Sequence, residues 1–228
     1  MNSILSFIES NGPMLLEGIR DTLYMTFVST FVAYIFGVPI GILAEITRKD
    51  SIYPMVIFNG ILGWIINIGR SIPFIILIVA IMPVTRKIVG TTIGPKAATV
   101  ALIIAAIPFV ARIVSNALRE VDDGVIEAAR AMGANNGQII FKVMLIETLP
   151  SLILGSSLTT ITLVGYTAMA GAVGGGGLGD IAIRFGYHRY QSDIMIVTIV
   201  LLVILVQVIQ STGQIISKKI DKKSKGEN

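Results

Sequence analysis

An all-α integral membrane protein with five transmembrane helices is the fold class that this sequence predicts. The chain has 228 residues, of which 54% are hydrophobic and 14% are charged, whereas soluble domains have about a quarter of their residues charged. Its mean hydropathy is +0.81. Five stretches reach the ~20 apolar residues that cross a bilayer. The chain has no cysteine, which excludes disulfides, thiolate metal sites and cysteine nucleophiles.

The expected spans follow from these apolar stretches. They lie at about 22–46, within 52–82, and at about 97–117, 149–173 and 194–216. Arg70 and Pro73 interrupt the second stretch, which is longer than one span requires. Part of residues 52–69 is therefore expected along the membrane interface, and Pro108 is expected to break the third span.

The two ends of the chain are polar. Residues 1–20 contain Glu9, Glu17 and Arg20 and lack the basic start of a signal peptide. They predict an N-terminal interfacial segment, followed by a transmembrane domain over 21–217. Residues 218–228 form a lysine-rich tail, which favours an anchor at an anionic lipid surface and not nucleic-acid binding.

The distribution of basic residues predicts the topology, because Lys and Arg are concentrated in cytoplasmic loops. An odd number of spans places the two termini on opposite sides. With the tail inside, ten loop and tail Lys and Arg residues lie inside and six outside. We therefore expect the N-terminus outside and the C-terminus in the cytoplasm, which puts the polar loop 120–146 in the cytoplasm as well.

That loop contains a short helix rich in small residues, beginning at residues 122–134. Asp122 or Asp123 can cap its N-terminus, and Glu127 lies early in the helix, where the helix dipole favours an acid. Glu127 and Arg130 are spaced to pair on the exposed side. Ala129 and Gly133, four residues apart, are expected on one face that a partner can approach closely. From these residues alone, docking into another protein and an amphipathic helix lying on the membrane remain equally open.

The same segment resembles the "EAA" loop of ABC-importer permeases. The resemblance rests on Glu127, Ala128 and Ala129, then Gly133, and then Val143 and Leu145. It implies that loop 120–146 is a coupling loop whose Glu127, Ala128, Ala129 and Gly133 contact an ATPase subunit. Ile146 stands where the family usually has proline, and Pro150 follows four residues later. The bend that ends the loop is therefore expected to have moved.

The resemblance extends over nearly the whole chain from about residue 22. The segments 70–74, 107–112, 162–171 and 186–187 are similar to those of methionine-importer permeases, with a type I ABC importer permease fold. This implies a homodimer in a bacterial cell membrane that forms the path for D- and/or L-methionine. It also implies two ATP-binding cassette subunits and an extracytoplasmic methionine-binding lipoprotein as partners.

No phosphate-binding loop is expected. The most similar segment, residues 90–96, lacks the Gly-Lys-Ser/Thr arrangement that binds phosphate. The chain is therefore expected not to be an enzyme, and ATP and Mg²⁺ are expected on the partner ATPase. His188, the single histidine, has no Cys or carboxylate neighbour in its loop and favours a surface residue over a metal ligand.

Candidate path residues lie in the second and fourth spans. Tyr166 and Met169 offer a ring and a thioether beside small residues, which suits either a path for an apolar zwitterion or helix packing. Arg70 is a further candidate because Pro73 frees backbone groups beside it. Charges within spans are costly and are functional candidates, although Glu45, Arg70 and Arg112 are more readily placed at helix ends.

A glycine-rich patch follows the fourth span. It matches G-x-G-x-x-G but lacks the βαβ context of a dinucleotide site, so we interpret it as a re-entrant turn at an outer gate or a docking surface for a binding protein. Its residues are Gly174, Gly175, Gly176, Gly177 and Gly179.

Three other functions are alternatives to a methionine permease. A permease for another amino acid or small solute differs only in cargo. A stand-alone channel needs no docking helix and conducts without ATP. An intramembrane enzyme lacks paired carboxylates or a nucleophile–base pair in the spans.

Overall fold

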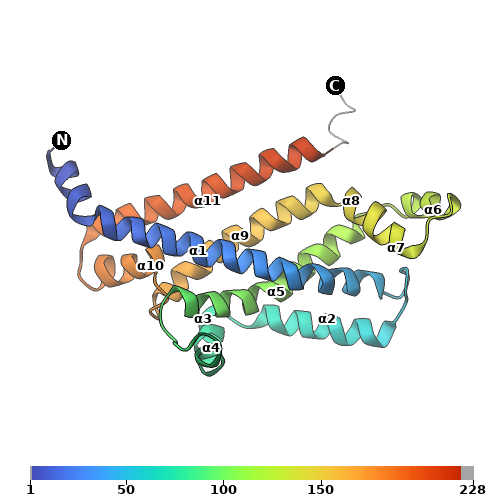
Figure 1. Ribbon diagram of the computed structural model, residues 1–228, viewed down its shortest axis with the longest axis horizontal. Coiled ribbons are helices and arrows are strands. Elements are labelled where there is room, and N and C mark those ends of the chain that lie inside the picture. Colours follow the sequence, from blue (N-terminus) through green and yellow to red (C-terminus); the bar gives the residue numbers. More distant parts are fainter. Residues whose placement is uncertain (1, 222–228) are drawn as a thin grey trace. The chain divides into compact units, whose positions relative to one another are not determined.

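Long apolar helices dominate the structure. The computed structural model describes residues 2–221, with side-chain surroundings for residue 7 and from residue 9 onward, and that range contains no strand. The four longest helices are candidate spans (Figure 1): α1 (Asn2–Ile46), α5 (Pro95–Arg119), α9 (Leu149–Gly171) and α11 (Ser192–Ile220). Helices α2 (Val56–Ser71) and α3 (Phe74–Ala80) form a pair bent by 97° that qualifies together as a fifth. The all-helical prediction is confirmed, with four or five candidate spans in the described range.

Short elements connect the long helices. In chain order they are α4 (Met82–Val89), α6 (Asp123–Ala131), α7 (Asn136–Gln138), the π-helix η1 (Ile139–Met144), α8 (Leu145–Glu147), α10 (Gly177–Ile181) and the π-helix η2 (Ala182–Tyr187). Figure 1 shows α6, α7 and α8 in succession between the end of α5 and the start of α9. They make up most of the loop that the sequence predicts to be polar.

The first span differs from its prediction at one end. It ends at Ile46 as expected, but the helix has no interruption from Asn2 onward, so residues 2–20 are continuous with it and do not form a separate helix. At ~1.5 Å per residue a helix of 45 residues is ~68 Å long. This exceeds the ~30 Å of hydrocarbon in a bilayer. Part of α1 must therefore lie outside the hydrocarbon, and an interfacial position for residues 1–20 stays a prediction.

The prediction that Pro108 breaks the third span is wrong. Helix α5 runs through Pro108 to Arg119. Proline removes one backbone donor but is tolerated in membrane helices when neighbours accommodate it. Here Gly69 of α2 provides the space, because a Cβ at Gly69 would lie 2.9 Å from Cγ of Pro108.

The break between α2 and α3 is where the sequence places it. Arg70 lies in the last turn of α2, and Pro73 is the N-cap residue of α3 with φ −59° and ψ 131°. A residue before proline is disfavoured in the helical region, which ends the first helix at Ser71.

The described residues form two compact units. Unit 1 comprises residues 2–32, 72–105 and 160–209, and unit 2 comprises residues 33–71, 106–159 and 210–221. In unit 1, Leu178 and Ile181 of α10 are buried, and Ile181 packs in a cluster with Leu15 and Ile194. In unit 2, a Cβ at Gly37 or Gly41 of α1 would meet α5, so glycine there permits close packing of the two helices.

Candidate functional site

The short helix α6 begins as the sequence predicts. Asp122 is its N-cap residue, and its Oδ1 accepts a hydrogen bond of 2.7 Å from the backbone N–H of Gly124. Asp123 lies in the first turn and Arg130 in the last, which complements the helix dipole at both ends. The sequence therefore specifies a well-capped helix immediately after the last turn of α5.

The C-terminal end of α6 differs from the prediction. The helix ends at Ala131, and Gly133 lies beyond it with φ +83°. The N–H of Gly133 donates to the carbonyl of Arg130 at 2.9 Å, and the N–H of Ala134 donates to that of Ala129 at 3.0 Å. This is a Schellman motif, in which glycine supplies the left-handed residue. Gly133 therefore does not share a helical face with Ala129, and that expectation is wrong.

One part of the exposed surface of α6 is apolar. Ala129 is 5% exposed and points into its own chain, whereas Ala128 and Ala131 are exposed. Val125 is 39% exposed and Met132 is 82% exposed. Residues three and four apart share one side of a helix, so Val125, Ala128, Ala131 and Met132 form one apolar surface, hereafter the α6 face. Of the predicted coupling residues, Glu127, Ala128 and Gly133 are exposed and Ala129 is not.

A second cap follows α6. Asn135 and Gln138 form a capping box at α7, in which each side chain bonds the other residue's backbone N–H at 2.9 Å. The chain then continues through η1 and α8 to an interruption at Thr148. Ile146 lies within α8, and Pro150 lies in the first turn of α9. The loop therefore ends two residues before Pro150 and two after Ile146.

A charged cavity of about 290 Å³ lies beside α6 in unit 2. Its wall contains four carboxylates and three guanidinium groups: Glu45, Asp50, Asp123, Glu127, Arg48, Arg119 and Arg130. Glu127 and Arg130 both line it, but the structure does not show the ion pair predicted between them. The nearly balanced set of charges distinguishes this cavity from the acidic one described next.

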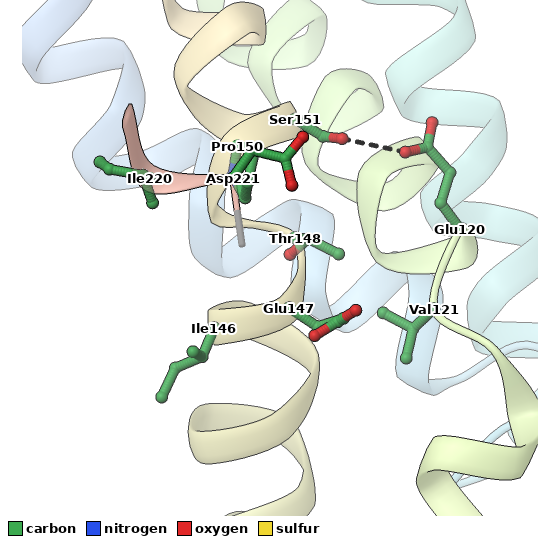
Figure 2. Close-up of a pocket in the computed structure, with 9 residues that line it drawn as sticks. All are labelled: Glu120, Val121, Ile146, Glu147, Thr148, Pro150, Ser151, Ile220 and Asp221. Carbon is green, nitrogen blue, oxygen red and sulfur yellow. Dashed lines mark hydrogen bonds between the residues drawn. The ribbon is translucent and has the colours of Figure 1, made fainter. Parts of the chain in front are cut away.

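A second, acidic cavity of about 180 Å³ shares Val121 in its wall with the charged cavity. Figure 2 shows Glu120, Glu147 and Asp221 around it, with Ser151 Oγ donating to Glu120 Oε2 at 3.0 Å. Ile220 and Asp221 bring the end of α11 to this cavity. Ser217 Oγ also donates to the carbonyl of Pro150 at 3.1 Å, which fixes the end of α11 at the start of α9.

At the base of the charged cavity, Glu45 is 2% exposed. Its Oε2 accepts hydrogen bonds from Arg119 Nε at 3.4 Å and from Ser115 Oγ at 3.3 Å. Its Oε1 lies 3.0 Å from Nε of Arg48, although that N–H is not aligned for a hydrogen bond. Glu45 occupies the last turn of α1, as the sequence predicts, but it is buried in an ion pair and does not extend toward water.

The candidate path residues are only partly brought together. In unit 1, the ring of Tyr166 is stacked on Phe74, the residue that follows Pro73. Met169, one turn farther along α9, is 49% exposed. Gly165 has open space where a Cβ would be. Arg70 belongs to unit 2.

The glycine patch forms a tight helical reversal. Gly174, Gly176 and Gly177 have φ of 78° to 80°, a backbone region that favours glycine. Gly175, Gly177 and Gly179 are buried. A Cβ at Gly179 would meet the backbone of Ala168 in α9, so α10 returns closely along α9. These contacts explain the glycines by packing, and a gating or docking role for them stays a prediction.

The α10 reversal is also held by α1. The backbone N–H of Leu178 donates to Thr22 Oγ1 at 2.9 Å, and Thr22 and Leu178 are both buried. A buried N–H at the start of a helix needs an acceptor. Here a threonine on the first span supplies it.

Comparison with protein families gives a match over most of the chain. The family described as "Binding-protein-dependent transport system inner membrane component" matches residues 37–222. The chain belongs to this family. It is accordingly a multi-pass protein of the bacterial inner membrane, and the resemblance to binding-protein-dependent permeases is confirmed.

Several curated members of this family are similar over nearly their whole length. The "Probable D-methionine transport system permease protein MetI" of Vibrio cholerae is 49% identical over 220 residues, covering 96% of this chain and 98% of that protein. The "Methionine import system permease protein MetP" of Bacillus subtilis is 47% identical over 203 residues, covering 89% and 91%.

Solved structures of the same kind match in fold. A chain of the MetNI methionine ABC transporter in an inward-facing conformation has a TM-score of 0.92 and 48% identity, covering 94% of this chain and 99% of that one. An amino acid ABC transporter chain has a TM-score of 0.78 at 18% identity and shows the fold alone.

Sequence reasoning missed two features of this inner membrane component. The contact of Glu45 with Arg119 joins residues that are 74 apart, and no local spacing indicates it. The α6 face was not predicted, because the prediction of a contact surface used Ala129 and Gly133, and neither residue belongs to this face. The i, i+3, i+7 spacing of Val125, Ala128 and Met132 is the signal that could have found it.

Proposed function

We propose that this chain is the permease subunit of an ATP-driven importer and forms the transmembrane path for methionine. The observation that carries the mechanism is the α6 face, an exposed apolar helix surface in a charged loop between two spans. The cargo is supported by relatives at 47–49% identity that are named for methionine transport.

Two copies pair about a two-fold axis normal to the membrane, with one path between them. Closed two-fold symmetry is the commonest arrangement among soluble homo-oligomers. The exposed α9 positions Met169 and Gly165 would then contribute to the path, together with Tyr166 and with Arg70 and Pro73 of the broken second span.

The α6 face docks on a separate ATP-binding cassette subunit, one for each copy. ATP and Mg²⁺ are bound by that partner, and this chain hydrolyses nothing itself. Segment 90–96, the nearest to a phosphate-binding loop, supports this assignment. The N–H of its Gly94 donates to the carbonyl of Gly174 at 2.8 Å and is not available to a phosphate. ATP binding draws the two docked helices together and turns the spans from inward-open to outward-open.

The topology follows from this coupling. If α6 meets an ATPase, it lies in the cytoplasm, with five spans, the C-terminus inside and the N-terminus outside. The excess of Lys and Arg on that side supports the same orientation. The α10 reversal then lies on the outer side, where an extracytoplasmic methionine-binding lipoprotein would deliver its ligand.

The test is uptake of labelled methionine into proteoliposomes. The permease is reconstituted with its ATPase subunits inside and its binding protein outside. We expect uptake with ATP, no uptake with a non-hydrolysable nucleotide, and none from the permease alone. Competition by unlabelled methionine but not by polar amino acids supports the cargo. Equal competition by polar amino acids, or flux through the permease alone, would contradict the proposal.

A further inference from the structure

Glu45 is a buried carboxylate held from two directions. Arg48 approaches it from the turn that follows α1, three residues farther along the chain, and Arg119 approaches it from the last residue of α5. The side chains of Arg48 and Arg119 are 41% and 48% exposed, whereas that of Glu45 is 2% exposed. One ion pair is therefore local to the end of α1 and the turn after it, and the other joins two helices.

The ion pair between Arg119 and Glu45 lies close to the start of α6. Three residues separate Arg119 from Asp123, where α6 begins: Glu120, Val121 and Asp122. Asp122 is already fixed by its capping hydrogen bond to Gly124. The link is thus too short and too ordered for α6 to change direction without moving the last turn of α5.

A cavity beside α6 limits the contacts that this helix makes with the end of α1. Ile126, Glu127 and Arg130 of α6 line the charged cavity together with Glu45 and Arg119. Between α6 and the end of α1 there is therefore a cavity and not a packed layer of side chains. Where α5 ends, just before α6, its Arg119 contacts Glu45 of α1, and Ser115 one turn earlier donates to the same carboxylate.

We infer that Glu45 is a positioning residue for coupling, which acts through Arg119 to transmit movement of α6 to the first span. The inference rests on the proposed function, because it needs an ATPase that moves α6. Energetic coupling is carried by contacts that link one rigid element to another. The Arg119–Glu45 contact is such a link, whereas Arg48 and Glu45 are three residues apart and their contact joins no second helix to α1.

The two arginines provide a matched pair of variants. Both contact Glu45 through Nε and both are partly exposed, so Arg48→Ala and Arg119→Ala each remove one guanidinium from the same carboxylate. If the arginines only balance a buried charge, the two changes have equal effects. If the link between helices matters, only Arg119→Ala separates ATP hydrolysis from transport.

The experiment uses the reconstituted complex of permease, ATPase and binding protein. Methionine uptake and ATP hydrolysis are measured together, with thermal stability in detergent as the structural control. We expect Arg119→Ala to lower uptake per ATP hydrolysed by about threefold or more, within the range for residues that carry coupling. Arg48→Ala should keep the ratio of the wild type. Arg119→Lys, which keeps the charge, should recover part of the lost coupling.

A second variant covers a failure of Arg119→Ala to assemble, because an uncompensated buried charge is destabilising. Glu45→Gln with Arg119→Gln removes both charges, and this pair should assemble with a reduced uptake per ATP. An equal ratio for both arginine variants, or a wild-type ratio for the double-glutamine variant, would overturn the inference. Failure of the wild-type complex to take up methionine with ATP would instead overturn the proposed function.

Discussion

The ring of Phe74 lies parallel to the ring of Tyr166, with 4.6 Å between the ring centroids and 6° between the planes. Phe74 is the first residue of α3, directly after the break at Pro73, and Tyr166 lies in α9. The stack therefore fixes the start of α3 on α9. Aromatic pairs of this kind stabilise by about 0.5–1.5 kcal/mol beyond the area that they bury.

Two substitutions of Tyr166 should distinguish the contribution of its ring from that of its hydroxyl. We expect Tyr166→Phe to transport methionine as the wild type does, because it keeps the stack. Tyr166→Leu should lower the midpoint of thermal unfolding by a few degrees, as ~1 kcal/mol does in a chain of this size, and should slow uptake. Tyr53→Leu, at an exposed tyrosine of unit 2, is the control. Slow uptake by Tyr166→Phe would show that the hydroxyl matters.

Gly133 should be sensitive to backbone conformation and not to side-chain bulk. No atom lies within 4 Å of a Cβ built there, but φ is +83°, and a left-handed residue other than glycine costs about 1–2 kcal/mol. Gly133→Ala and Gly133→Leu should therefore weaken ATPase binding to a similar degree. Gly133→Asn should be milder, because asparagine adopts this conformation more readily. Pull-down of the ATPase subunit measures the effect, and a far larger loss for leucine than for alanine would restore the close-docking explanation.

Met132 should contribute directly to ATPase binding. Its side chain is 82% exposed on the α6 face, and burying such a side chain is worth about 1.5–3 kcal/mol. Met132→Asp should therefore weaken binding of the ATPase subunit by about tenfold or more, since tenfold corresponds to ~1.4 kcal/mol. Met132→Leu keeps the apolar surface and should bind normally. Membrane insertion and thermal stability of the free permease should not change in either variant.

Thr22 should stabilise the α10 reversal through one hydrogen bond. Thr22→Val preserves shape but leaves the buried N–H of Leu178 without its acceptor, at a cost of about 1–3 kcal/mol. We expect a lower unfolding midpoint in detergent and faster proteolysis within residues 171–187. Thr22→Ser keeps the hydroxyl and should resemble the wild type. Identical unfolding of the valine and serine variants would rule out this role.

The sequence predicts the helical elements where local chemistry decides them. The end of α1 at Ile46, the start of α9 at Leu149 and the break at Pro73 are examples. The prediction of a break at Pro108 is wrong because Gly69, which is distant in sequence but adjacent in space, leaves room for the proline ring.

Only those features of the candidate site that depend on residues close together in the sequence could be predicted. The cap at Asp122 depends on residues two positions apart and was foreseen. The burial of Ala129 depends on how α6 packs on the rest of its unit, and the role of Gly133 on where the helix ends. Neither the Glu45–Arg119 contact nor the Phe74–Tyr166 stack has a local signal, because each joins residues on different helices.

The bond between Ser217 and the carbonyl of Pro150 has a practical consequence for labelling this protein. It holds the end of α11 beside α8, so Asp221 lines the same cavity as Ile146 and Glu147. A fluorescent label attached near Asp221 would therefore lie beside residues 146–151, and its signal should follow any movement of that segment relative to the end of α11.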